Sequence, residues 1–216
     1  MELPPHYVDP VTLHEVLDDV PAARAYLADL AAGAASDEPT VLAVRVPLLR
    51  VLAPEADDPD AQLAEAERLG WLAVGLAGGP AGDAAAAHAP AHEVPLGAVA
   101  PLLRLAHVLQ WRHRFSEADL LFGLALEATR YHGEHAASVE HARRLECRTL
   151  YHWGRCRYEQ ALEVHVEQAR PYLGEALALF VRALELRVDV AASPEEVATV
   201  RQAIQAARDR LAELGA

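Results

Sequence analysis

Two segments of this chain, residues 117–127 and 175–185, repeat one pattern of residue types. Each begins with Glu-Ala, has a Phe four residues after the alanine, and has Ala-Leu-Glu three residues beyond the Phe. On a helix, the small alanines allow a neighbouring helix to approach closely, and the Phe fills the groove beside them. One such pair of helices cannot bury its apolar face alone, so pairs of this kind stack on one another. The pattern therefore favours an array of stacked helix pairs.

The composition extends the helical prediction to the rest of the chain. Ala, Leu, Glu and Arg fill most of it, and strand signals are nearly absent. Several expected helices start at an Asp or Ser followed by Pro, and Ser193 with Glu196 forms a capping box. Ser116 is the expected N-cap of another helix, and residues 78–95 are the expected loop. The expected helices span about residues 10–18, 21–32, 39–52, 59–77, 98–111, 116–130, 138–170, 173–187 and 194–214.

The repeated pattern resembles the tetratricopeptide repeat (TPR). The matching positions of the first repeat are Leu102, Leu105, Ala106, Phe115, Ala118, Phe122 and Ala125, and the second repeat begins with Leu150, Trp153 and Gly154. The resemblance covers about residues 98–187, with about ten extra residues, 161–170, inside the second repeat. It implies an all-α fold in which antiparallel helix pairs stack as a right-handed superhelix with a C-terminal capping helix. The alternative is a generic helical bundle, in which these residues are only good helix formers.

Acidic residues are concentrated in the N-terminal part. Residues 1–95 hold 16 acidic residues and 4 arginines, whereas residues 96–216 hold 16 and 15. We therefore expect an acidic helical region over 1–95, which can also be read as degenerate repeats, and TPR-like repeats with a capping helix over 96–216. The net charge of −13 argues against binding to nucleic acid or to anionic membranes. Since the chain has no lysine, lysine-based catalysis is excluded.

The resemblance implies binding rather than catalysis. We expect a protein–protein interaction module, an adaptor or scaffold, whose first helices line a concave groove for a peptide or protein partner. Because a guanidinium binds a carboxylate bidentately, Arg104 and Arg155 are expected to contact an acidic or C-terminal carboxylate group of the partner. The alternative for both arginines is a solvated side chain that pairs with helix glutamates. The residues that helical periodicity places on the groove face are Arg104, His107, Gln110, Trp111, Tyr151, His152, Arg155 and Tyr158.

A self-assembling structural subunit, or homo-oligomer, is the first alternative function, and a metal- or small-molecule-dependent helical enzyme is the second. The enzyme would use a His/Cys cluster, in which His132, His135 and Glu140 could bind a metal. His152 and Cys156 also have the spacing of two ligands on one helix. We expect no metal, no cofactor and no catalysis, because the chain has neither His-Glu-x-x-His nor a nucleotide-binding glycine pattern.

The two cysteines indicate the compartment. Cys147 and Cys156 are nine residues apart in one expected helix, which separates them by about 13.5 Å along its axis and prevents a disulfide. Two unpaired thiols favour a reducing cytosol. The N-terminus lacks the pattern of a signal peptide, and no stretch is long and apolar enough for a membrane span. We therefore expect a cytoplasmic protein. Abundant Arg and Ala without Lys indicate a GC-rich bacterial genome.

Overall fold

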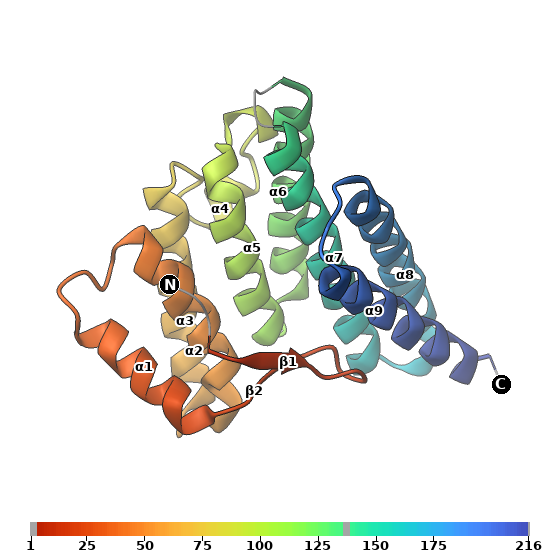
Figure 1. Cartoon of the computed structure of the whole chain (residues 1–216), viewed down its shortest axis with the longest axis horizontal. Coiled ribbons are helices and arrows are strands. Elements are labelled where there is room, and N and C mark those ends of the chain that lie inside the picture. The colour runs from red at the N-terminus through yellow and green to blue at the C-terminus, as the bar shows by residue number, and fades with distance from the viewer. Residues whose placement is uncertain (1–3, 136–138, 216) are drawn as a thin grey trace. The chain divides into compact units, whose positions relative to one another are not determined.

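The computed structural model describes residues 4–135 and 139–215, and within these ranges the chain is helical apart from one short β-hairpin (Figure 1). The all-α prediction is therefore confirmed for the described residues. The hairpin pairs β1 (His6–Val8) with β2 (Glu15–Leu17) in antiparallel register. The helices are α1 (Val20–Ala32), α2 (Pro39–Leu52), α3 (Pro59–Leu76), α4 (Asp83–Ala86), α5 (Leu96–Trp111), α6 (Phe115–His135), α7 (Val139–Glu163), α8 (Val166–Asp189) and α9 (Pro194–Glu213), with short 3-10 turns at Ala53–Glu55 and Ala91–Glu93.

The chain divides into two compact units. Among the described residues, unit 1 comprises residues 4–8 and 14–124, and unit 2 comprises the rest, including residues 9–13. The division falls inside α6, after Leu124. The division expected at residue 95 follows the change of charge along the sequence, whereas packing keeps residues 96–124 with the N-terminal helices.

Two helices of unit 1 begin at an aspartate that caps the first turn. The Asp19 carboxylate accepts a hydrogen bond of 2.9 Å from the Ala22 amide at the start of α1. The Asp58 carboxylate accepts one of 2.9 Å from the Ala61 amide at the start of α3. Each carboxylate thereby satisfies an amide that the first turn of a helix leaves without a partner.

The core of unit 1 lies between α2, α3 and α5. Leu42 of α2, Leu69 of α3 and Val108 of α5 are fully buried in one apolar cluster. Gly70 allows α3 and α5 to pack closely, because a Cβ at this position would lie 2.9 Å from Cδ1 of Leu105. Any larger residue at position 70 would have to displace a fully buried leucine.

A three-residue turn joins α5 to α6, so these helices are antiparallel neighbours as predicted. In the turn, His113 has the left-handed φ of 56°. Across the pair, the rings of His107 and Phe122 are 5.7 Å apart and nearly edge-on. The predicted ends of α6 were wrong, because Ser116 lies within its first turn rather than at the N-cap, and the helix continues past Gly133.

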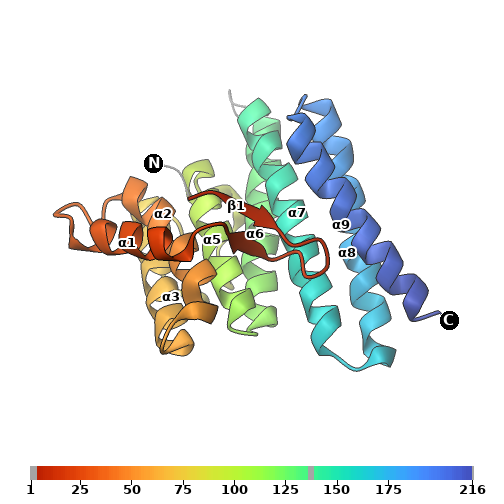
Figure 2. The ribbon, with the colours of Figure 1, turned by 60° about the horizontal axis from the view of Figure 1, so that its bottom comes forward.

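Unit 2 is built on α7, α8 and α9, which lie side by side (Figure 2). Gly154 of α7 packs directly on the ring of Phe180 of α8, since a Cβ there would lie 2.6 Å from Cε1 of that ring. The predicted capping box of α9 is confirmed: Ser193 Oγ accepts a hydrogen bond from the Glu196 amide at 3.2 Å, and the Ser193 amide donates one to the Glu196 carboxylate at 3.1 Å. The helix expected over residues 138–170, or a helix with an extension there, ends at Glu163 instead. The next helix, α8, begins at Val166 and so includes Pro171.

The helix predicted over residues 10–18 is also wrong. Asp9 does accept hydrogen bonds from the amides of Val11 and Thr12, at 3.0 and 2.7 Å, as an N-cap would. However, Leu13 has a φ of 59°, which turns the chain back, so that β2 pairs with β1 (Figure 2). The side chain of Asp9 therefore caps a tight loop instead of a helix.

Candidate functional site

The eight residues predicted to line a groove lie on α5 in unit 1 and on α7 in unit 2. Three of them, Arg104, Trp111 and His152, are partly exposed. The other five are buried in the structure rather than facing solvent as expected, since each exposes at most 7% of its surface. These residues are His107, Gln110, Tyr151, Arg155 and Tyr158.

In unit 1, side chains of the same chain cover Trp111. The ring centroids of His14 and Trp111 lie 5.0 Å apart, and the guanidinium carbon of Arg50 lies 5.3 Å from the Trp111 ring centroid. Arg50 is itself buried and pairs with Glu15 of β2. The indole Nε1 of Trp111 is buried and has no hydrogen-bond acceptor among the described residues. The segment around β2 thus covers the α5 face that we expected to be open.

In unit 2, the loop at residues 9–13 covers Tyr158. The phenol of Tyr158 donates a hydrogen bond of 2.9 Å to the main-chain carbonyl of Val11. Burial raises the pKa of Tyr158 above its ordinary value, so the phenol stays protonated as a donor. Further along α7, the guanidinium carbons of Arg155 and Arg187 lie 5.9 and 5.0 Å from the ring centre of Tyr151. Arg155 is therefore stacked in the interior rather than presented to a partner.

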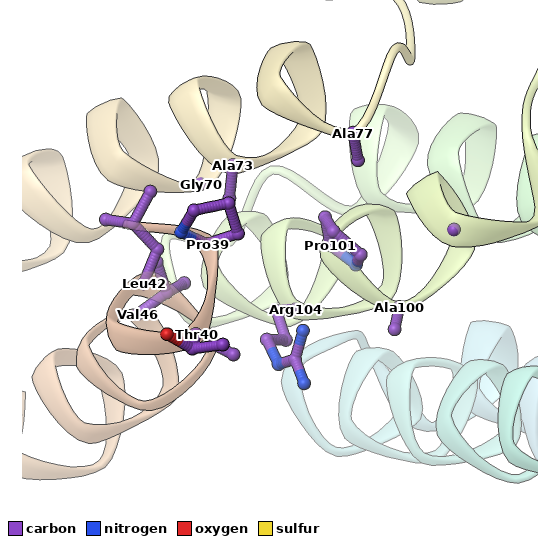
Figure 3. A pocket seen from close by; sticks show the side chains of 12 residues that line it. Pro39, Thr40, Leu42, Val46, Gly70, Ala73, Ala77, Ala100, Pro101 and Arg104 are labelled. Atoms are coloured by element: carbon purple, nitrogen blue, oxygen red, sulfur yellow. The ribbon is translucent and has the colours of Figure 1, made fainter. Parts of the chain in front are cut away.

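Arg104 lines a cavity of about 260 Å³ between α2, α3 and α5, all within unit 1. The walls are largely apolar and include Leu42, Ala73 and Pro101. Figure 3 shows Arg104 and Thr40 along the same border of this pocket. A guanidinium beside an apolar cavity can bind the carboxylate of a ligand whose apolar part enters the cavity.

The sequence contains a signal for this pocket that the prediction did not use. Gly70, Ala73 and Ala77 follow one another at spacings of three and four residues, which places them on one face of α3. This face of small residues forms one wall of the cavity. Sequence reasoning identified Arg104 but missed the pocket, because its other walls come from helices that are distant in the sequence.

The histidine cluster does not converge on a metal site in the described residues. Among them, no three His, Cys, Asp or Glu side chains lie close enough together to hold a metal ion. His135 stacks on Tyr131 at 4.4 Å, and its Nδ1 lies 2.7 Å from the Tyr131 carbonyl oxygen. His132 contacts the same tyrosine ring edge-on, at 5.4 Å.

Both cysteines are buried and unpaired. Burial raises the pKa of Cys147 to about 11. Its thiol is therefore protonated near neutral pH, whereas a nucleophilic cysteine needs the thiolate. Cys156 is fully buried, which agrees with a packing role for a small apolar side chain in a helix.

Comparison of this chain with protein-family models, with curated proteins and with solved structures gave no match. Within the described residues, none of the helices combines the length and the apolar character that crossing a membrane requires.

Proposed function

We propose that this protein is a TPR-like binding module, an adaptor that takes the C-terminal end of a partner chain into the cavity between α2, α3 and α5. The observation that carries the proposal is an apolar cavity bordered by the guanidinium of Arg104. The repeat interpretation is supported by the buried phenylalanines Phe122 and Phe180, which occupy equivalent positions of the repeated pattern. Arg155, which is stacked against Tyr151, takes no part in this proposal.

The volume of the cavity suits one apolar side chain. A dry apolar cavity of about 150 Å³ can hold a benzene molecule. A cavity of about 260 Å³ therefore accommodates a Leu, Met or Phe side chain. Burying such a side chain contributes about 1.5–3 kcal/mol.

The charge of the chain favours a ligand with a single carboxylate. Residues 1–95 hold 16 acidic residues against 4 arginines, so a partner segment with several acidic residues would be repelled. A C-terminal carboxylate brings one charge, and a hydrogen bond from Arg104 to it contributes about 1.5–3 kcal/mol. The two contributions sum to about 3–6 kcal/mol before the cost of association, so we expect weak binding, with dissociation constants of about 1 mM or more. We place this binding in the cytoplasm, where two unpaired thiols stay reduced.

Fluorescence anisotropy with labelled hexapeptides that end in Leu, Met or Phe tests the proposal. Each peptide is used as the free acid and as the C-terminal amide. We expect the free acid to bind about tenfold or more tightly than the amide, since amidation removes the charge that Arg104 recognises. The Arg104→Gln variant should lose this preference, and Ala100→Phe, which fills the cavity, should lose binding of both forms.

Arg68→Gln is the matched control, because Arg68 lies on α3, is exposed and pairs with Glu65 at 2.7 Å. It should bind the peptides as the wild type does. The proposal is contradicted if the amides bind as tightly as the acids, or if Arg104→Gln behaves as Arg68→Gln does. Absence of peptide binding together with a concentration-dependent mass in sedimentation experiments would instead support the self-assembling subunit.

A further inference from the structure

Unit 2 contains a second cavity, of about 210 Å³, which is bordered by α7, the C-terminal end of α8 and the first turn of α9. Its lining is basic in a chain whose net charge is −13. The charged side chains that line it are those of Arg144, Arg148, Arg187 and Glu196, and His141 adds an imidazole. With three guanidinium groups and one carboxylate, and the histidine counted as neutral, the lining carries a net charge of +2.

Arg187 is the buried cation of this cavity. It exposes 6% of its surface, donates a hydrogen bond to the Glu196 main-chain carbonyl and lies over the ring of Tyr151. Among the described residues, Arg187 forms no ion pair with a carboxylate. Burial is also the main reason why the pKa of Arg187 is lowered from its ordinary value. The charge of Glu196 opposes this effect in part. Because burying a cation is unfavourable, an anion in the cavity would offset more of the cost.

Arg148 brings a second positive charge to the same place. The proximity of Arg148 lowers the pKa of Arg187 further, as expected for two like charges. Within the described parts of the chain, Arg148 has no carboxylate partner. Arg144 pairs with Glu140 on the exposed side of α7, at 3.0 Å. Glu146, the other nearby carboxylate, pairs with Arg130 at 3.1 Å.

Helical spacing explains why these side chains converge. His141, Arg144 and Arg148 are separated by three and four residues, so they lie on one face of α7. Arg187 reaches the cavity from α8, which packs against α7. The basic face of one helix and a buried arginine of its neighbour thus border one space.

We propose that this cavity is a binding site for a phosphate group, either free or carried by a small phosphate ester. A phosphate monoester has a charge of about −1.5 to −2 at neutral pH and three acceptor oxygens. This matches a lining with a net charge of +2 and guanidinium donors from separate positions. A carboxylate would offer two oxygens and one charge, and would leave part of the basic lining uncompensated. This site is independent of the peptide-binding proposal, which concerns unit 1.

Isothermal titration calorimetry tests the site with inorganic phosphate, phenyl phosphate and acetate as the probes, at constant ionic strength. We expect saturable binding of one phosphate per chain, and about tenfold weaker binding of acetate. Arg148→Gln is the informative variant, because Arg148 is exposed and its replacement leaves the core unchanged. It should lower the affinity for phosphate by about tenfold or more.

Arg182→Gln is the matched control, because Arg182 lies on α8, is exposed and pairs with Glu185 at 2.9 Å. It should leave phosphate binding unchanged. Tighter binding of phenyl phosphate than of inorganic phosphate supports the site and assigns it to an ester, whereas the reverse supports the site and assigns it to the free ion. The proposal is overturned if phosphate does not bind saturably, if acetate binds as tightly as phosphate, or if Arg148→Gln and Arg182→Gln have the same effect.

Discussion

The packing of Gly154 on Phe180 predicts that replacing this glycine with alanine destabilises the protein. A Cβ at position 154 would lie 2.6 and 2.7 Å from two carbons of the Phe180 ring, well inside normal contact distance. Phe180 is fully buried, so the ring cannot move into solvent to avoid the contact. The substitution therefore overpacks the interface between α7 and α8.

Two effects of opposite sign set the magnitude. Overpacking a tight core costs about 1–3 kcal/mol, and the short contact at Gly154 places this site in the upper part of that range. Alanine in a helix interior is favoured over glycine by about 1 kcal/mol. We therefore expect Gly154→Ala to lower the free energy of unfolding by about 1–2 kcal/mol. For a chain of this size, the melting temperature should fall by about 2–8 °C.

Urea denaturation followed by circular dichroism measures this change. Gly174→Ala is the matched control, because Gly174 lies in α8 and a Cβ there would meet nothing within 4 Å. It should raise the free energy of unfolding by about 0.5–1 kcal/mol. In a Phe180→Leu background, the cost of Gly154→Ala should shrink, which a double-mutant cycle detects. If Gly154→Ala stabilises the protein as Gly174→Ala does, the argument from close packing is refuted.

Three further predictions concern the described contacts. Ser193→Ala should lower the free energy of unfolding by about 1 kcal/mol, because it removes the capping box of α9. The control, Ser116→Ala, removes no cap and should have little effect. Equal effects of the two substitutions in urea denaturation would contradict the assignment of the cap. Tyr158→Phe removes the hydrogen bond to the N-terminal loop and should cost about 1 kcal/mol in the same assay. The comparison is Tyr172→Phe, which should be neutral, and a neutral Tyr158→Phe would show that the bond contributes nothing. The unfolded thiol of Cys147 ionises near pH 9.0 and the folded one near pH 11, so the stability contributed by this thiol is complete below pH 9 and is lost as the pH rises towards 11. Cys147→Ala should reduce this loss of stability with pH, and an unchanged slope would rule out the thiol as its source.

Helix starts with a side-chain cap were predictable from the sequence. Asp19, Asp58 and Ser193 each cap a helix in the structure, because a capping hydrogen bond joins residues only three positions apart. Such contacts can be predicted from a few neighbouring residues of the sequence. For the same reason, the short turn between α5 and α6 allowed the antiparallel pairing to be predicted.

Elements decided by distant contacts were not predictable in this way. Asp9 makes the same local hydrogen bonds in the observed loop as it would at a helix start. The choice between loop and helix depends on the pairing of β1 with β2 and on the bond between Val11 and Tyr158, which are 147 residues apart. Pro171 misled the prediction of α8, because a proline near the start of a helix removes few hydrogen bonds and is tolerated there.

The candidate site shows the same contrast between local and distant contacts. Arg104, which periodicity assigned to a groove face of α5, borders a cavity between α2, α3 and α5 instead. The same periodicity could not show that His14 covers Trp111, or that Tyr158 bonds to the N-terminal loop. A helical pattern defines which side chains share a face, whereas the neighbour that covers this face depends on the whole fold.

The bond between Val11 and Tyr158 also has a consequence for synthesis on the ribosome. The partner of this early loop is translated 147 residues later, which takes about 7–30 s at 5–20 residues per second. During this interval Leu13, which is almost fully buried in the finished protein, lacks its final surroundings. The loop at residues 9–13 thus leaves the ribosome well before it can reach its native contacts. Nascent chains stopped before Tyr158 should therefore be cleaved more readily at residues 9–13 than chains that extend past it.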